Sequence, residues 1–185
     1  MILAQLAKSF ARIPKKEKPI DEALLAGYYR ICHTDQLIQH VLSRRLPERD
    51  RAFWSKAANE ESGHADLYRK DLEGFYGDQF EPVLYRYIPC PEICSLMRWA
   101  RQKPVHLGVY RAYMESALVS MNEAAKEAFR IVLPRTAEVH LALDPHHIQE
   151  CVEYLEHFPE EQITEHIETV EEAFKHESLW IGLIQ

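Results

Sequence analysis

The sequence predicts an all-α fold, and three observations support this class. Only six of the 185 residues are glycine, and the chain lacks the Asn-Gly and Asp-Gly dipeptides that favour β-hairpins. Apolar residues recur with the period of an amphipathic helix over several long stretches. Prolines separate these stretches. We therefore expect one domain over residues 1–185, a bundle of about seven helices with its core over about 20–184.

The first three helices are expected over residues 2–13, 21–46 and 48–75. A basic segment over 14–19 joins the first two. Asp21 is expected to cap the start of the second helix, and Pro47 ends it because proline cannot continue the helical hydrogen bonding. Gly74 and Gly77 are the stop signals of the third helix.

The remaining four helices are expected over residues 91–102, 104–133, 136–158 and 160–183. Residues 78–89 are aromatic and irregular, so we expect a loop there. Pro91 and Pro104 suit the first turns of their helices. Asp144-Pro145 has the pattern of an N-cap followed by proline, which predicts a kink or an unwound turn within 136–158.

The composition argues against nucleic-acid and membrane binding. The formal net charge is −7, and no run of lysine and arginine supplies the cationic face that phosphates require. No stretch approaches the roughly twenty apolar residues that span a bilayer. The N-terminal residues lack the pattern of a secretory leader, and the cysteines are sparse, so we expect a cytoplasmic protein.

The four cysteines do not form a disulfide framework. Cys90 and Cys94 are four positions apart, and no second cysteine pair accompanies them, so a structural zinc site is not expected. We interpret both as ordinary thiols.

A triplet, His140-x3-Asp144-x2-His147, is the most informative pattern in the chain. Positions i, i+4 and i+7 of a helix share one face, so two imidazoles and a carboxylate would point in the same direction. These are the side chains that bind iron, manganese and related metals. His146 is rotated by about 100° from His147 on a helix and is not expected to be a ligand.

Glu61-x2-His64 and Glu115 can complete a larger site. Apolar residues flank Glu61 at helical spacing, namely Trp54, Ala58, Ala65, Tyr68 and Leu72. Gly108 and Ala112 lie on the face of Glu115, so both carboxylates are expected to face the core. A carboxylate in that position needs a cation, a proton or a metal.

Other interpretations of these acids remain open. An arginine or lysine from another helix could pair with Glu61, and Arg98 or Arg101 could pair with Glu115. Glu60 competes with Glu61 as a ligand. His33 and His40 also share a helix face, but no acid accompanies them there, which favours a solvated or hydrogen-bonded pair.

The six residues together are the ligand supply of a dinuclear iron or manganese centre in a helical protein. They are Glu61, His64, Glu115, His140, Asp144 and His147. Three inward carboxylates would otherwise require several buried cations. Two divalent irons would leave a net charge of about +1, which is a much smaller burial cost.

The order of these motifs on successive helices resembles the haem-oxygenase-like dimetal oxidases and oxygenases. These are the branch of the haem-oxygenase/TenA-like superfamily often labelled iron-containing redox enzymes. The resemblance extends from about Asp21 to Phe174, and the triplet is its specific part. It implies a seven-helix fold, commonly dimeric, in which the matching positions bind two irons that activate O2. Members carry out N-oxygenation, oxidative decarboxylation or C–C cleavage of fatty acids and amino acids, or form para-aminobenzoate from their own tyrosine.

We therefore expect a homodimeric non-haem diiron enzyme that uses O2 and an electron donor to oxidise an amine, an amino acid, a fatty acid or its own tyrosine. Four tyrosines are candidate pocket residues by helical phase, namely Tyr28, Tyr29, Tyr110 and Tyr113. A metal-free TenA-like hydrolase would instead need a nucleophilic cysteine, either Cys32 or Cys151. A non-catalytic iron-binding or partner-binding role is the third possibility.

Overall fold

The computed structural model describes residues 1–13 and 20–176, which are almost wholly helical and contain no strand. The all-α class is therefore confirmed for this part of the chain. The α-helices are α1 (Ile2–Arg12), α2 (Ile20–Leu42), α3 (Glu48–Glu61), α4 (His64–Tyr76), α5 (Phe80–Arg86), α6 (Pro91–Ala100), α7 (Pro104–Val119), α8 (Glu123–Val132), α9 (Pro134–Leu155) and α10 (Glu160–His176).

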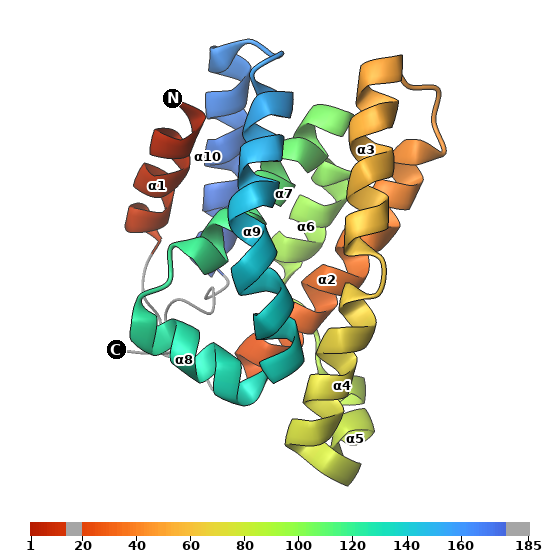
Figure 1. Cartoon of the computed structure of the whole chain (residues 1–185), viewed down its shortest axis with the longest axis vertical. Helices are drawn as coiled ribbons and strands as arrows, with labels where there is room; N and C mark the ends of the chain where they lie inside the picture. Colours follow the sequence, from red (N-terminus) through yellow and green to blue (C-terminus); the bar gives the residue numbers. More distant parts are fainter. Residues whose placement is uncertain (14–19, 177–185) are drawn as a thin grey trace.

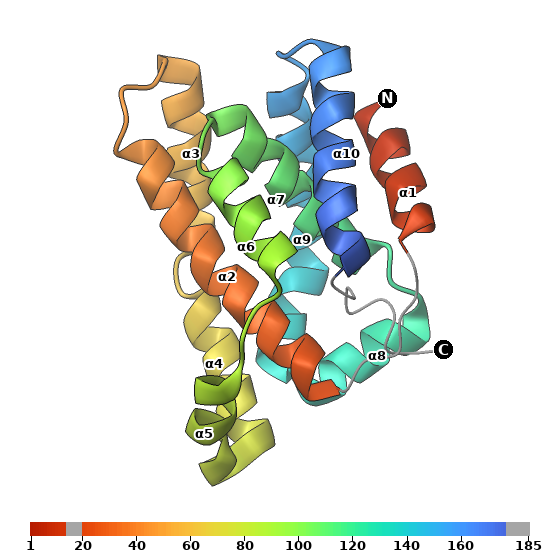
Figure 2. The ribbon, with the colours of Figure 1, turned by 180° about the vertical axis from the view of Figure 1, so that it is seen from behind.

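The helices α7 and α9 form the most extensive contact in the bundle. Figures 1 and 2 show α9 on one face of the molecule and α2 and α6 on the opposite face, with α8 lying across one end. Gly108 permits the close approach of α7 and α9, because an added Cβ would lie 3.0 Å from a Tyr154 ring atom and 3.2 Å from Leu155.

The buried apolar residues form two clusters. The larger cluster fills the space between α2, α3, α6, α7, α9 and α10, whereas the smaller one lies around α4 and α8. Along α9, Ala137 belongs to the smaller cluster and Ile148 to the larger one. The polar triplet occupies the stretch of α9 between these two positions.

The expected helix over 48–75 is interrupted between Glu61 and His64. Gly63 adopts φ +90°, in the left-handed region, and precedes the first residue of α4. Glycine reaches this conformation without a steric penalty, and the helix divides there for that reason. The prediction that Glu61 and His64 share one helix is therefore wrong: they face each other across a break.

The expected helix over 104–133 is also divided. Asn122 accepts a hydrogen bond from the Ala125 backbone N–H and so caps α8. In addition, residues 78–89 contain a short 3-10 turn (Gly77–Gln79) and α5 where a loop was expected. Because of these two divisions and α5, the described part of the chain contains ten α-helical segments where about seven were expected.

Two further helices, α2 and α9, also differ from expectation. Asp21 lies inside α2 rather than at its cap, because α2 begins at Ile20. Of the kink or unwound turn predicted at Asp144-Pro145, the unwound turn is not found: α9 continues through Pro145, whose missing N–H removes one helical hydrogen bond. The linker over 14–19 and the expected end of the last helix over 177–183 lie outside the described residues.

Within residues 1–13 and 20–176, no helix combines the length and hydropathy needed to cross a membrane.

Candidate metal centre

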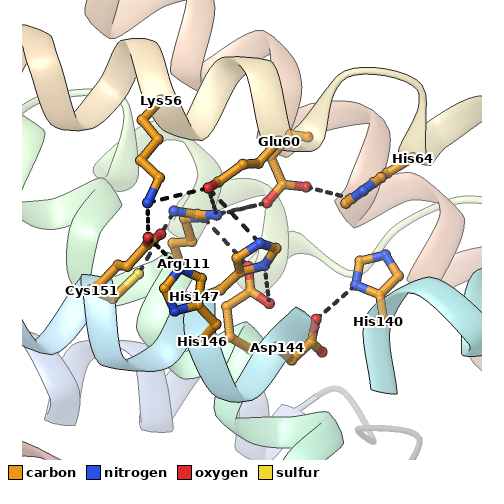
Figure 3. Close-up of polar contacts among 12 residues, drawn as sticks. Lys56, Glu60, His64, Arg111, His140, Asp144, His146, His147 and Cys151 are labelled. Carbon is orange, nitrogen blue, oxygen red and sulfur yellow. Dashed lines mark hydrogen bonds and ion pairs between the residues drawn. The ribbon is translucent and has the colours of Figure 1, made fainter. Parts of the chain in front are cut away.

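The triplet of α9 points into the bundle, as Figure 3 shows. Asp144 is fully buried, His147 is 2% exposed and His140 is 9% exposed. His146 has the opposite environment: its side chain is 64% exposed and its Nε2 atom lies 2.8 Å from Glu150 Oε1. The helical phase inferred from the sequence is therefore correct despite Pro145.

Glu61 and His64 lie on the two sides of the break between α3 and α4 and approach the triplet from there. His64 Nδ1 and Glu61 Oε2 are hydrogen bonded at 3.1 Å, and both residues are buried. The His64 ring centroid lies 4.7 Å from that of His140, which joins the two motifs. On α9 itself, His140 Nδ1 and Asp144 Oδ1 are hydrogen bonded at 3.1 Å.

Glu115 of α7 lies between these groups and is common to two sets of possible metal ligands. One set, the Glu61 triad, comprises Glu61, Glu115 and His147, and the other, the Asp144 triad, comprises Glu115, His140 and Asp144. In each triad, one ligand atom per residue lies within 4.8 Å of the others. Five of the six predicted ligands thus fall into two adjoining triads, with His64 bonded to Glu61 beside them.

Arg111 is the buried residue of this site that sequence reasoning missed. It is 1% exposed, and its Nε atom lies 3.3 Å from Glu61 Oε1 and 3.4 Å from Glu115 Oε1. Arg98 and Arg101, which the alternative interpretation paired with Glu115, are exposed and form hydrogen bonds elsewhere. The spacing of four between Arg111 and Glu115 on one helix was the available signal.

Glu60 lies at the edge of the site, and its side chain is 21% exposed. Its Oε2 atom is 3.4 Å from Arg111 and 3.8 Å from His147 Nε2, and Lys56 approaches Oε1 at 3.6 Å. Lys56 also pairs with Glu150. Glu60 therefore pairs with basic side chains and is not a member of either triad.

Burial and the neighbouring charges shift the pKa values of the carboxyl groups in opposite directions. Burial raises the pKa of Asp144 to about 7 and that of Glu115 to about 7. Burial has the same tendency at Glu61, but the hydrogen bond with His64 and the charge of Arg111 outweigh it and lower the pKa of Glu61 to about 2. Glu115 and Asp144 can thus hold protons near neutral pH, which a divalent cation would displace.

The donor set fits a divalent metal. Asp144 Oδ2 is buried and has no hydrogen-bond partner, although buried carboxylate oxygens are ordinarily satisfied. A cation held by the Asp144 triad would satisfy this atom. Carboxylate oxygens and imidazole nitrogens together suit iron, manganese and zinc.

Asp71 of α4 fixes the start of α9. Its Oδ2 atom accepts hydrogen bonds from the Thr136 backbone N–H and hydroxyl, both at 2.8 Å, and Oδ1 accepts from Arg135. A carboxylate at a helix N-terminus satisfies free N–H groups and complements the helix dipole. Because α4 begins with His64, this bond also relates the positions of His64 and the triplet.

A cavity with a volume of about 100 Å³ adjoins the two triads and is partly open to solvent. Glu61, Glu115 and His140 form its polar end together with Arg111. Its other lining residues are Gly27, Arg30, Ile31, Thr34, Tyr68, Met114, Ala117, Met121, Phe129 and Thr136. The cavity thus joins a mostly apolar chamber to the candidate ligands.

The four tyrosines expected at the pocket do not line this cavity. Tyr113 is fully buried: its hydroxyl is hydrogen bonded to Ser9 at 3.1 Å, and its ring stacks on Phe174. Tyr110 is also fully buried, whereas Tyr28 and Tyr29 are partly buried and pack on neighbouring rings. The prediction for Tyr113 was wrong because positions two residues apart on a helix differ by about 200°, which places this side chain nearly opposite Glu115 on α7. Tyr113 contacts α1 and α10 instead.

The cysteine and histidine alternatives have ordinary structural environments. Burial raises the pKa of Cys151 to about 12 and also raises that of Cys32, so neither thiol is activated as a nucleophile. His33 Nδ1 is bonded to the Tyr29 carbonyl at 2.9 Å, and His40 contacts arginine side chains. These two histidines are thus hydrogen bonded separately, in agreement with the interpretation favoured from the sequence.

Comparison with protein-family models, with curated proteins and with solved structures gives no match to this chain. The functional assignment therefore rests on the residues and geometry of the candidate metal centre.

Proposed function

We propose that this chain is a non-haem diiron oxidase or oxygenase with the haem-oxygenase-like fold implied by its sequence motifs. The observation that carries the proposal is the pair of triads that share Glu115 beside a mostly apolar cavity. A carboxylate common to two ligand sets is the arrangement that a dinuclear site requires. Mononuclear sites need only about three protein ligands.

The proposed ligands divide between the two metals. Glu61 and His147 would hold one metal, and His140 and Asp144 the other, with Glu115 between them and His64 completing the set. When bound, two irons would supply the electrons that activate O2, and manganese suits the same donors. Turnover would also require an external electron donor.

The chain's own residues would bind the substrate and limit the access of water. The apolar lining of the cavity favours a small, largely hydrocarbon molecule. Arg30, which is 3% exposed, lies in the same wall, and with Arg111 it places two guanidinium groups in a lining whose acids are Glu61 and the partly protonated Glu115. This excess of positive charge favours a carboxylic acid over an amine. Tyr68 is the tyrosine among the described lining residues and is the candidate for oxidation of the chain itself.

A homodimeric state and a cytoplasmic location belong to the same proposal. The first is implied by the resemblance to the dimetal oxidases, and the second by the sparse cysteines.

The test is anaerobic loading with Fe(II), followed by metal analysis and exposure to O2. We expect close to two irons per chain, O2 consumption and a transient visible absorption band that Glu115→Ala eliminates. Substrates would be sought among fatty and amino acids, whose presence should shorten the lifetime of the band. Iron binding without O2 uptake or a band would instead favour a non-catalytic iron-binding role, and the absence of iron binding would exclude both.

A further inference from the structure

Arg111 contacts the two triads unequally (Figure 3). Its Nε atom lies near Glu61 and Glu115, which are two of the three members of the Glu61 triad. No contact of Arg111 with His140 or Asp144 is found among the described residues. The Asp144 triad therefore meets this cation only through the shared Glu115.

The charge on Arg111 is permanent, because a guanidinium does not lose its proton in proteins. At 1% exposure, water cannot screen it effectively. A divalent ion in the Glu61 triad would lie next to this positive charge. It would also have to take carboxylate oxygens that Arg111 already contacts.

The Asp144 triad offers a metal the opposite environment. The buried Asp144 Oδ2 atom has no hydrogen-bond partner, Oδ1 is bonded to His140, and Glu115 of the same triad also contacts this carboxyl group. A metal in this triad gains an oxygen ligand without breaking an ion pair to Asp144. The two triads therefore differ in the free-energy cost of admitting the first cation.

Glu60 supplies Arg111 with another carboxylate partner. Its Oε2 atom is 3.4 Å from Arg111 Nη2, and Glu60 belongs to neither triad. Arg111 can retain this partner when Glu61 and Glu115 bind a metal. Lys56, 3.6 Å from Glu60, holds the same carboxylate from the solvent side.

We infer that Arg111 competes with metal for the Glu61 triad, so that the Asp144 triad binds metal first and the Glu61 triad binds second and more weakly. This inference rests on the metal centre proposed above but not on its reaction with O2. Arg111 would be a positioning residue that stabilises the Glu61 and Glu115 carboxylates before metal binds and sets the order of loading.

Titration of the metal-free full-length chain with Mn(II) tests the order, with free Mn(II) measured by electron paramagnetic resonance. We expect two steps, with the second dissociation constant at least about tenfold larger than the first. Asp144→Asn should abolish the tight step, and His147→Ala should abolish the weak one. Two steps with equal dissociation constants would overturn the inference. Loss of the weak step in Asp144→Asn together with loss of the tight step in His147→Ala would also overturn it.

Arg111→Met tests the cause. Removing the charge should lower the second dissociation constant by about tenfold or more, so that the two steps approach each other, whereas Arg111→Lys should retain the separation. Lys126→Met is the matched control, because it also removes one positive charge but Lys126 pairs with Glu123 on α8 and contacts neither triad. It should leave the second step unchanged. A second step that is unaltered or weakened in Arg111→Met contradicts the role assigned to Arg111.

Glu60→Gln provides a test if Arg111→Met fails to fold, because Glu60 is partly exposed. This change removes a carboxylate partner of Arg111 outside the triads, so Arg111 should hold Glu61 and Glu115 more firmly. The second dissociation constant should therefore increase relative to the first. A separation that is unchanged or narrower would overturn the inference. The absence of any Mn(II) binding by the wild-type protein would reject the metal centre itself, which is distinguishable from two equal steps.

Discussion

His146 and His147 are neighbours in the sequence, yet only His147 faces the carboxylates of the candidate centre. The His147 Nδ1 atom is 3.6 Å from Glu115 Oε2, whereas the largely exposed His146 pairs with Glu150. The two residues differ by about 100° around α9, and that rotation decides which imidazole is available to a metal.

This difference predicts the behaviour of single substitutions on α9. His140→Ala, Asp144→Ala and His147→Ala should each remove at least one metal per chain, because each deletes a buried donor atom. His146→Ala should retain both. Iron content after anaerobic loading measures the effect, and far-ultraviolet circular dichroism checks that helicity is unchanged. Loss of metal in His146→Ala together with retention in His147→Ala would contradict the observed helical phase.

The raised pKa values of Asp144 and Glu115 predict how stability depends on pH. The folded metal-free chain holds protons that the unfolded chain has released between about pH 4.5 and about pH 7. The contribution of these two carboxyl groups to the free energy of unfolding should therefore fall as pH rises through this window. The lowered pKa of Glu61 acts only at lower pH. The lowered pKa values of His40, His106, His140 and His166 contribute a slope of the opposite sign below about pH 6.5. Urea unfolding over this window therefore compares Asp144→Asn with the wild type, and the slope of the variant should be less negative or more positive. Equal slopes in the two proteins would contradict the shift assigned to Asp144.

Metal affinity should show the complementary pH dependence. A metal ion must displace the protons on Glu115 and Asp144, so Mn(II) binding should weaken as pH falls from about 7 to about 5. Free Mn(II) measured by electron paramagnetic resonance reports the binding. Affinity that is constant over this range would show that neither carboxyl group is protonated there.

At the scale of elements, the centre depends on where helices end and how they are capped. Gly63 divides α3 from α4, so that Glu61 and His64 approach from two different helices. Asp71 then connects α4 to the start of α9. These two features fix the positions of α3, α4 and α9 relative to one another.

Gly63→Ala should destabilise the protein by about 1–2 kcal/mol, because an L-residue is strained at φ +90°. Gly74→Ala is the matched control on α4: no atom lies within 4 Å of the added Cβ, and its helical position favours alanine by roughly 1 kcal/mol. Urea unfolding should therefore shift in opposite directions for the two variants. A shift of both in the same direction would contradict the left-handed assignment of Gly63.

At the scale of the whole molecule, six helices and the turn between α7 and α8 surround the cavity beside the centre. Its Arg30 comes from α2, and its candidate ligands come from α3, α7 and α9. The chamber and the charges that meet a substrate thus arise from segments far apart in the chain.

This arrangement predicts charge selectivity that can be measured without metal or O2. Octanoate should bind to the metal-free protein more tightly than octylamine, because the guanidinium groups of Arg30 and Arg111 outweigh the Glu61 carboxylate while Glu115 is partly protonated at neutral pH. Isothermal titration calorimetry measures both affinities, with 1-octanol as the uncharged reference. Met121→Trp, which fills the apolar wall, should weaken all three. Equal or tighter binding of octylamine would exclude the carboxylate preference.

The sequence by itself determined the all-α class and the inward direction of the proposed ligand residues, because both follow from periodicity within single helices. Glu61, Glu115 and the triplet on α9 could be identified in this way before any contact between helices was known. The break at Gly63 was missed, since a glycine within an apolar helical pattern is compatible with either a continuous or a divided helix.

Only the tertiary structure decided that Glu115 is shared by two triads, that Arg111 contacts Glu61 across the bundle, and that Tyr68 rather than Tyr113 lines the cavity. Each of these facts depends on the distance between residues of different helices. Helical phase specifies which way a side chain points from its own axis, but the packing of α7 against α9 and the neighbouring helices sets what that side chain meets.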